Sequence, residues 1–378
     1  MGSDMEPIKA AFWNLQNLFD STASPIAADL EFTPAQGWTA QAVDAKIEVL
    51  VDGILGMFAG TGPDLLGICE IENEALAQRL ILRLRAKSGR NDYTLAHAES
   101  PDIRGIDCSL IYSDDIFELA GAPKGHLVHL RYPTRDIFEV PLRIKATQDE
   151  LTVFVTHWPS RRGGSAQSEP FRITVSAHLG RLIDERLKLP RDAIEASPDP
   201  RVLQDVIDRL WDANILVMGD LNDDPFNTSV LSTLRASNSI DRLEAVIETA
   251  KKDGTPIADF KKTYIGRQAE LYNFSWSWLG QSGAGTIFYA EAGMPRTKQC
   301  FDQIIGSRAL YYGNNGLIIR EEDVSIHAPK SMWTDQRLPD SAPLHMVRPK
   351  SFDRKNFTGV SDHFVVTALI RAVEPLIA

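Results

Sequence analysis

The sequence contains little cysteine. Only Cys69, Cys108 and Cys300 occur among 378 residues, and they lie far apart. An odd, scattered set of this kind argues against a disulfide framework and against a zinc cluster, because both require paired or closely spaced cysteines. No hydrophobic run approaches the roughly 20 apolar residues that a membrane-spanning helix requires. These absences favour a globular protein without a membrane span.

Positive charge is also scarce. The chain has 40 Lys and Arg against 51 Asp and Glu, which gives a formal net charge of -11. An acidic surface offers no general attraction to nucleic acid or to anionic membranes, so a polyanionic substrate would need a local basic cluster or a bound metal ion. The N-terminal stretch lacks the basic and apolar segments of a signal peptide, which predicts a cytoplasmic protein. The alternative is a secreted protein from which a signal peptide has been removed.

Short apolar runs are present throughout, and turn residues lie close to them. They indicate buried strands at residues 8–15, 64–71, 108–113, 151–158, 214–221, 301–307 and 363–370. Apolar residues at helical spacing lie between some of these runs. They are Val43, Ile47, Leu50, Ile54 and Met57 in one segment, Phe171, Val175, Leu179 and Leu182 in a second, and Val206, Leu210 and Trp211 in a third. Together with strands joined only by turns over residues 105–158, this predicts an α/β fold with mixed sheets and outer helices.

Nothing in the sequence marks a linker that would divide the chain. A single domain is therefore predicted over residues 8–372. Residues 187–203 are rich in proline and charge and are predicted to form a surface insertion before a helix. Residues 251–300 are rich in glycine, polar residues and aromatics, which predicts long loops and short strands near a functional site.

Polar residues recur where the predicted strands begin or end. Taken singly, each has an ordinary explanation as a turn residue, a helix cap or a salt-bridge partner. A folded sheet can, however, bring such strand ends together at one rim. The residues are Asn14 in "FWN", Glu70 in "ICEIEN", His157 in "VTHWPS", Asp220 and Asn222 in "GDLNDDP", Asp302 in "FDQII", and Asp362 and His363 in "SDH". Their joint occurrence predicts a site rather than a series of turns.

The acidic stretch "VMGDLNDDP" at residues 217–225 has three readings when considered by itself. It lacks the glycine and the distal glutamate of an EF-hand loop, which argues against a calcium hand. A polar turn and a catalytic metal site remain as alternatives from this stretch alone.

Metal-assisted phosphoester hydrolysis would use this set of residue types. A hard divalent cation prefers carboxylate, amide and water oxygens, and it stabilises the leaving oxyanion. A nearby aspartate can orient or deprotonate the attacking water, and two histidines can donate hydrogen bonds to the phosphate. Arg104 and Arg161 lie beside the strand-end motifs and are predicted to contact phosphate, because arginine matches phosphate geometry.

In this order, the motifs resemble those of the endonuclease/exonuclease/phosphatase superfamily. That superfamily includes pancreatic-type deoxyribonucleases, exonuclease III-type apurinic endonucleases, neutral sphingomyelinases and inositol polyphosphate 5-phosphatases. The resemblance extends from about residue 8 to residue 370 and is carried by "FWN", "PDLLGICEIEN", "VTHWPS", "GDLNDDP", "FDQIIGS" and "SDH". The stretches "WNLQNLFD", "SPDIRGID", "THWPSRRGG" and "GVSDHF" are similar to those of a bacterial subgroup.

The resemblance implies a four-layer α/β sandwich, with two packed mixed β-sheets flanked by helices. It also implies a divalent metal ion, Mg²⁺ or Mn²⁺, with Ca²⁺ as a further alternative. The metal ligands implied in this chain are Asn14, Glu70 and Asp362.

Catalytic roles are likewise carried over from the resemblance. Asp220, with Asn222 beside it, would activate or orient the attacking water. Asp302 and His363 would form an Asp–His pair. His157 would be the second histidine that contacts the phosphate.

The leading functional prediction is a phosphodiesterase, most specifically a nuclease that hydrolyses DNA or RNA, single strands included, or a nucleotide-like diester. The lack of a long basic stripe weighs against double-stranded DNA. The alternative is a phosphatase or phosphodiesterase for a small or lipid phosphoester, such as an inositol phosphate or a sphingomyelin-like headgroup. Trp276 and Trp278 could form a membrane-docking loop for the lipid case, or serve in the core or in base stacking. An alternative of another class is a non-catalytic binding protein that keeps the fold.

Overall fold

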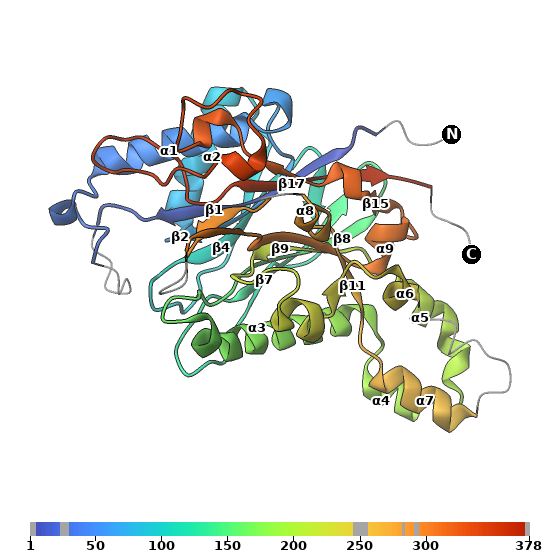
Figure 1. Cartoon of the computed structure of the whole chain (residues 1–378). Coiled ribbons are helices and arrows are strands. Elements are labelled where there is room, and N and C mark those ends of the chain that lie inside the picture. Colours follow the sequence, from blue (N-terminus) through green and yellow to red (C-terminus); the bar gives the residue numbers. More distant parts are fainter. Residues whose placement is uncertain (1–4, 23–29, 245–255, 282–283, 291–294, 375–378) are drawn as a thin grey trace.

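Two β-sheets lie face to face at the centre of the molecule, with helices against their outer faces (Figure 1). They are seen in a computed structural model that describes residues 5–22, 30–244, 256–281, 284–290 and 295–374. The four-layer α/β sandwich expected from the sequence is confirmed.

The first sheet has seven strands, in the order β15-β17-β1-β2-β4-β3, with β16 also paired to β17. Strands β1 and β2 run parallel, and the other pairs are antiparallel. The strands are β1 (Ile8–Leu18), β2 (Leu65–Ile71), β3 (Tyr93–His97), β4 (Asp107–Ser113), β15 (Leu317–Ile319), β16 (Ser325–His327) and β17 (Val365–Ala372).

The second sheet has eight strands, in the order β10-β11-β14-β9-β8-β7-β5, with β6 also paired to β7. It is mixed as well, because β8 and β9 run parallel while β14 and β7 run antiparallel to them. The strands are β5 (Phe117–Leu119), β6 (Lys124–His126), β7 (Ile137–Ile144), β8 (Glu150–His157), β9 (Ile215–Asp220), β10 (Ala236–Ser237), β11 (Leu271–Asn273) and β14 (Asp302–Gly306). A separate hairpin pairs β12 (Ile287–Tyr289) with β13 (Thr297–Gln299).

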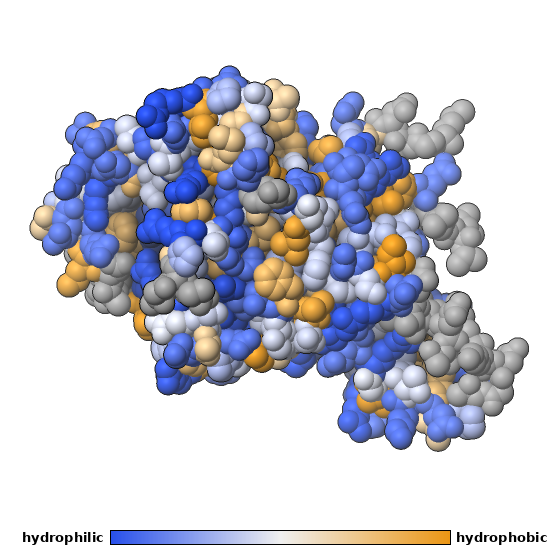
Figure 2. All heavy atoms as spheres, viewed as in Figure 1, coloured by the Kyte–Doolittle hydropathy of each residue, from blue (hydrophilic) through white to orange (hydrophobic). Residues whose placement is uncertain are grey.

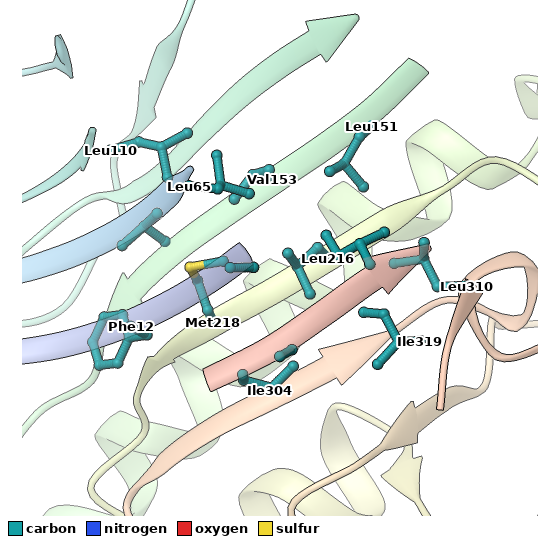
Figure 3. Close-up of a cluster of buried hydrophobic side chains, with 14 of the residues drawn as sticks. Phe12, Leu65, Leu110, Leu151, Val153, Leu216, Met218, Ile304, Leu310 and Ile319 are labelled. Atoms are coloured by element: carbon teal, nitrogen blue, oxygen red, sulfur yellow. The ribbon is translucent and has the colours of Figure 1, made fainter. Parts of the chain in front are cut away.

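The main hydrophobic core lies between the two sheets. Alternate residues of each strand point to the same face of the sheet, so every second side chain along a strand enters this core. Figure 3 shows Phe12 and Leu65 of the first sheet close to Met218 and Ile304 of the second. Trp278 is buried in the same cluster, which gives this tryptophan a core role.

Helices cover the outer faces of both sheets. Helices α1 (Ala40–Leu55) and α2 (Glu74–Ser88) pack on the first sheet, and α3 (Ser165–Leu187) packs on the second (Figure 1). The other helices are α4 (Arg191–Ala196), α5 (Gln204–Trp211), α6 (Ile240–Glu244), α7 (Ile257–Gly266), α8 (Trp276–Leu279) and α9 (Arg308–Tyr312). The three predicted helical faces lie in α1, α3 and α5, except that Met57 of the first face lies beyond the end of α1.

Helices α4, α5 and α7 form an arm that projects from the sandwich (Figure 1). A small cluster of its own, made by Ile194, Ile207, Phe260 and Tyr264, holds this arm together. The predicted insertion at residues 187–203 lies here and contains α4. The prediction of loops and short strands over residues 251–300 is wrong in part, because residues 257–266 form α7. Residues 251–255, 282–283 and 291–294 of that stretch lie outside the described residues.

Among the described segments, no helix is both long and apolar enough to cross a membrane. On the face seen in Figure 2, hydrophobic residues lie scattered among hydrophilic ones rather than in one continuous band. All three cysteines are buried free thiols.

Candidate active site

The rim of the second sheet carries three polar side chains on neighbouring strands. On β9, Leu216 and Met218 face the core, and Asp220 occupies the next position of the same face. The strand register places His157 beside Asp220 on one side and Asp302 beside it on the other. Paired residues of neighbouring strands share a face. The apolar rows of the core therefore end in His157, Asp220 and Asp302 at one rim.

The first sheet contributes Asn14 in the same way. Asn14 follows Phe12 on the inward face of β1 and is buried. Its Nδ2 donates a hydrogen bond of 3.0 Å to Oδ2 of Asp220, across the space between the sheets. Its Oδ1 accepts one of 2.9 Å from the backbone N–H of Gln16. Asn14 therefore joins the two sheets at the rim.

Glu70 reaches the rim through an irregularity in β2. The pairing of β2 shifts register between Cys69 and Ile71, and Glu70 has a φ of 63°. A left-handed backbone is unfavourable for a residue with a Cβ, and such bulges redirect a side chain. Oε2 of Glu70 accepts a hydrogen bond of 2.9 Å from the N–H of Asn17, and Oε1 lies 3.8 Å from Nε2 of His157.

Two imidazoles face the carboxylate of Asp220. Nε2 of His157 lies 3.6 Å from Oδ2 of Asp220, and Nε2 of His363 lies 3.8 Å from the same oxygen. Nδ1 of His363 lies 2.7 Å from Oδ2 of Asp302. The predicted Asp302–His363 pair therefore exists in the structure, with its open nitrogen toward Asp220.

The two histidines differ in charge. Burial, with help from the positive charge of Arg135 and Arg104, holds the pKa of His157 well below its usual range. Burial also disfavours the charged form of His363, but Asp302 and Asp220 outweigh it and raise the pKa of His363 well above its usual range. At neutral pH the site thus presents one neutral imidazole and one imidazolium.

The pKa of the Asp220 carboxyl group lies close to neutral pH. Burial raises its pKa to about 7, against the opposing effects of His363, of the Asn222 backbone N–H and of the Asn14 amide. A carboxyl group whose pKa lies near the working pH can take up and release a proton.

Asp362 lies next to His363, in the segment that precedes β17. Burial and the nearby charge of Glu70 raise the pKa of this carboxyl group, while His363 and Lys46 oppose the shift. The buried ammonium of Lys46, on α1, donates a hydrogen bond to the carbonyl of Val360. Burial lowers the pKa of Lys46 to about 7, although Asp362 and Glu70 act in the opposite direction.

These donors fit a hard divalent cation. Glu70 and Asp362 supply carboxylate oxygens at one rim, and Asn14 supplies an amide, which are the ligand types of Mg²⁺ or Mn²⁺. Burial is the largest cause of the raised pKa of Asp362 and the charge of Glu70 adds to it, so a bound cation would offset both effects. Asp220, Asp302 and His363 also offer ligand atoms within 4.8 Å of one another, but the Asp302–His363 hydrogen bond already occupies part of that group.

Asn222 has a supporting position. Its backbone N–H donates to Oδ1 of Asp220 at 2.9 Å, and its Nδ2 donates to the carbonyl of Trp158 at 3.0 Å. Its φ of 49° lies in the left-handed region, which is typical of a tight turn. Asn222 therefore fixes the Asp220 carboxylate and the strand end that follows His157.

Arg161 lies beside the turn that follows Asp220, where its Nε donates to the carbonyl of Asn222 at 2.8 Å, and its phosphate contact stays a prediction. Its guanidinium is buried, donates to Oδ1 of Asp223 at 2.9 Å and stacks over the ring of Phe301. Arg172 of α3, which is also buried, lies 2.7 Å from Oδ2 of Asp223. This geometry favours a role for Arg161 in holding the loop after Asp220.

Arg104 stays close to the site. One of its Nη atoms donates to Oδ1 of Asn17, the residue whose N–H binds Glu70. It also lines a cavity, together with Pro159 and Ser160, which closely follow His157 along the chain.

Sequence reasoning missed several residues that support this site. Lys46, Arg135 and Arg172 are buried charged residues, and their burial depends on the fold. A signal existed only for Lys46, which lies on the apolar face of a predicted helix, one position before Ile47.

Comparison with known proteins adds the family. The family model described as the endonuclease/exonuclease/phosphatase family matches residues 9–255, which is more than half of the sequence. The chain belongs to the endonuclease/exonuclease/phosphatase family. The name of the family describes hydrolases of phosphoesters. The family resemblance predicted from the sequence motifs is therefore confirmed. A comparison with curated protein sequences gave no significant match.

Solved structures of several other proteins are similar to this chain. The human Nocturnin catalytic domain, solved with a bound sulfate anion, has 15% sequence identity and a TM-score of 0.50, over 99% of this chain and 97% of that chain. TDP2 from Caenorhabditis elegans has 13% identity and a TM-score of 0.50, over 97% of this chain and 75% of that chain. A mannosyl-6-phosphatase from Bacteroides thetaiotaomicron has 12% identity and a TM-score of 0.49, over 97% and 100% of the two chains. At such identities the similarity concerns the fold alone.

Proposed function

We propose that this protein is a divalent-metal-dependent phosphodiesterase, with nucleic acid or a nucleotide-like diester as its substrate. The observation that carries the proposal is the convergence on Oδ2 of Asp220. The Asn14 amide lies 3.0 Å from this oxygen, and the two histidine Nε2 atoms lie 3.6 and 3.8 Å from it. Few structural roles would require two buried imidazoles and a buried amide around one buried carboxylate.

The residues divide the work by their charge. Glu70, Asp362 and Asn14 are proposed to hold the metal ion, which polarises the phosphoryl oxygen and stabilises the leaving oxyanion. Asp220, with a pKa near 7, is proposed to orient the attacking water and accept its proton.

The histidines are proposed to meet the phosphate. The imidazolium of His363 donates from Nε2 while Asp302 holds Nδ1, so positive charge is placed where negative charge builds up. Because its pKa is lowered, His157 is uncharged, so it can donate a second hydrogen bond to the phosphate without repelling the metal cation.

Hydrolysis of bis-p-nitrophenyl phosphate with Mg²⁺, Mn²⁺ or Ca²⁺ tests this proposal. We expect turnover that EDTA abolishes and that Asp220→Ala or His363→Ala lowers by roughly 10²-fold or more. Glu74→Gln, on the exposed first turn of α2, serves as the matched control. No turnover with any of the three metals would refute the enzyme, and full activity in both alanine variants would refute the assigned site.

A parallel screen assigns the substrate class. Single- and double-stranded DNA, RNA, inositol phosphates and choline lipids are each incubated with Mg²⁺ and with Mn²⁺. Cleavage of inositol phosphates or choline lipids, with nucleic acids left intact, would replace the nuclease proposal by the small-phosphoester alternative.

A further inference from the structure

Four arginines surround a single cavity beside the proposed active site. The cavity has a volume of about 380 Å³. Its wall includes Pro159 and Ser160, the residues that follow His157 and Trp158. Four arginines and two aromatic residues also line the cavity, namely Arg104, Arg131, Arg135, Arg162, Tyr132 and Phe171. This concentration of positive charge stands out in a chain with a net charge of -11.

The acidic side chain in the cavity wall already accepts hydrogen bonds from residues of that wall. Among the described residues that line the cavity, Asp102 is the only acidic one, and it is buried. Its Oδ2 accepts from Arg135 at 3.1 Å, and its Oδ1 accepts from the backbone N–H of Arg104. Arg135 also donates to the carbonyl of Trp158 at 2.8 Å, which ties this wall to the loop after His157. The wall therefore keeps a net positive charge.

Arg131 and Arg162 lie at the surface of the protein. Both side chains are exposed, and within the described part of the chain neither forms an ion pair or a side-chain hydrogen bond. Arg131 has its guanidinium 4.9 Å from the ring centre of Phe171. An arginine stacked on an aromatic ring keeps its N–H donors at the ring's edge available for an anion.

The N-terminal end of α3 adds to the positive electrostatic potential in the cavity. Gly163, Gln167 and Ser168 at this helix end line the cavity, and the helix continues for 23 residues. Gly164, at the N-cap, provides no side chain to bind the first backbone N–H groups. Those N–H groups and the helix dipole favour an anion, in addition to the arginines.

The cavity also has a flat apolar side. Tyr132 and Phe171 pack edge to face with ring centres 5.3 Å apart. Aromatic side chains next to arginines are what a nucleobase and its phosphate require, because the base stacks while the phosphate is bound by charge.

We propose that this cavity binds a second phosphate of the substrate, adjacent along a nucleotide strand to the phosphate that is hydrolysed. Arg131 and Arg162 bind that phosphate, and Tyr132 with Phe171 contacts the neighbouring base or sugar. The inference rests on the proposed function for the identity of the first phosphate. It makes the protein a phosphodiesterase for phosphorylated oligonucleotides rather than for isolated diesters.

Dinucleotides test the second-phosphate site in turnover. The kcat/KM of thymidylyl-thymidine is compared with that of the same dinucleotide carrying a terminal 5′- or 3′-phosphate, with Mg²⁺. In the wild-type protein we expect one phosphorylated form to be better by about tenfold or more. The double variant Arg131→Ala/Arg162→Ala should lose this preference. The control Arg191→Ala/Arg209→Ala removes the same charge from the projecting arm and should keep it.

Binding tests the cavity without turnover. Calorimetry with thymidine 3′,5′-bisphosphate and with thymidine 5′-monophosphate is done on the wild type and on both double variants. We expect the bisphosphate to bind about tenfold tighter than the monophosphate, and only the Arg131→Ala/Arg162→Ala variant to lose the difference. Circular dichroism confirms that each variant is folded.

The outcomes separate the two proposals. Equal affinity for the two nucleotides in the wild type would overturn the second-phosphate site even if bis-p-nitrophenyl phosphate is hydrolysed. A preference for the bisphosphate that depends on the two arginines, without any turnover, would support the cavity and refute the proposed activity. Tight binding of inositol 1,4-bisphosphate, with none of the thymidine bisphosphate, would overturn the assignment to a nucleotide.

Discussion

His363 Nδ1 lies 2.7 Å from Oδ2 of Asp302, although 61 residues separate the two along the chain. Asp302 begins a strand of the second sheet, whereas His363 precedes the last strand of the first. The hydrogen bond therefore holds the two sheets together at the rim and fixes the orientation of the imidazole. A histidine fixed in this way keeps its Nε2 directed at Asp220.

The first prediction concerns Asp302→Asn. The Asp302 carboxylate is a main reason why the pKa of His363 is raised, so its removal should lower that pKa. Because the imidazolium is the active form, the alkaline limb of the pH–rate profile should move to lower pH. The rate below that limb should also fall by about 10²–10⁴-fold, since the ring loses its support.

A pH profile of kcat/KM on bis-p-nitrophenyl phosphate measures both effects. Asp199→Asn, on the projecting arm, is the control and should leave the profile unchanged. A reduced rate with an unmoved alkaline limb would mean that His363 does not act as the charged donor.

A second prediction concerns metal binding through Glu70→Gln. The amide keeps the size of the side chain but removes the charge that attracts the cation, so the Mg²⁺ concentration for half-maximal activity should rise by about tenfold or more. Titration of activity with Mg²⁺, together with calorimetry of Mg²⁺ binding, measures the change. Glu74→Gln should behave like the wild type, and an unchanged Mg²⁺ dependence in Glu70→Gln would exclude Glu70 as a ligand.

The third prediction concerns the buried charges behind the Asp220 loop. Asp223 lies between Arg161 and Arg172, at 2.9 and 2.7 Å, and accepts a hydrogen bond from the Ser229 hydroxyl. Asp223→Asn would remove this counter-charge from two buried guanidinium groups, of which Arg161 keeps Asp224 at 3.5 Å. We expect a loss of about 3–5 kcal/mol in the free energy of unfolding.

Urea denaturation monitored by circular dichroism measures that loss. The matched control is Asp335→Asn, which removes a carboxylate from an exposed pair with Arg337 and should change stability little. A loss as small as that of the control would show that the buried network adds nothing to the fold.

The fourth prediction uses the buried Lys46. Its pKa is lowered to about 7 in the folded protein, against roughly 10.4 in an unfolded chain. Between these values the unfolded state binds one more proton, so the free energy of unfolding should rise with pH, by up to about 1.4 kcal/mol per pH unit. Lys46→Met should remove this rise.

Denaturation at several pH values between about 7 and 10, in EDTA, gives the slope for each protein. Lys124→Met, at an exposed strand position, should keep the slope of the wild type. Equal slopes in the wild type and in Lys46→Met would show that Lys46 titrates near its ordinary pKa.

The sequence predicted the strands that carry the site because their patterns are local. The run at 214–221 became β9 at Ile215–Asp220, and the run at 301–307 became β14 at Asp302–Gly306. Helix α2 was missed, although Leu76, Leu80 and Leu84 follow helical spacing in it. The four-layer arrangement came from the resemblance and not from these patterns.

The orientation of charged side chains could not be predicted in this way. Arg161 and Arg162 are neighbours with the same chemistry, yet the first is buried against Asp223 and the second is exposed at the cavity. Which arginine turns inward depends on where Asp223 and Phe301 lie after folding. No local pattern contains that information, so the roles assigned to the site residues remain predictions for the experiments above.

The register of β8, β9 and β14 determines how well the protein tolerates a slip in the pairing of these strands. His157, Asp220 and Asp302 continue the rows that fill the core, so a slip of one residue between these strands would turn a catalytic side chain to the opposite face. The same slip would expose the apolar residues of that strand to the helix layer. A change of register that displaces one of these polar side chains would therefore also destabilise the protein.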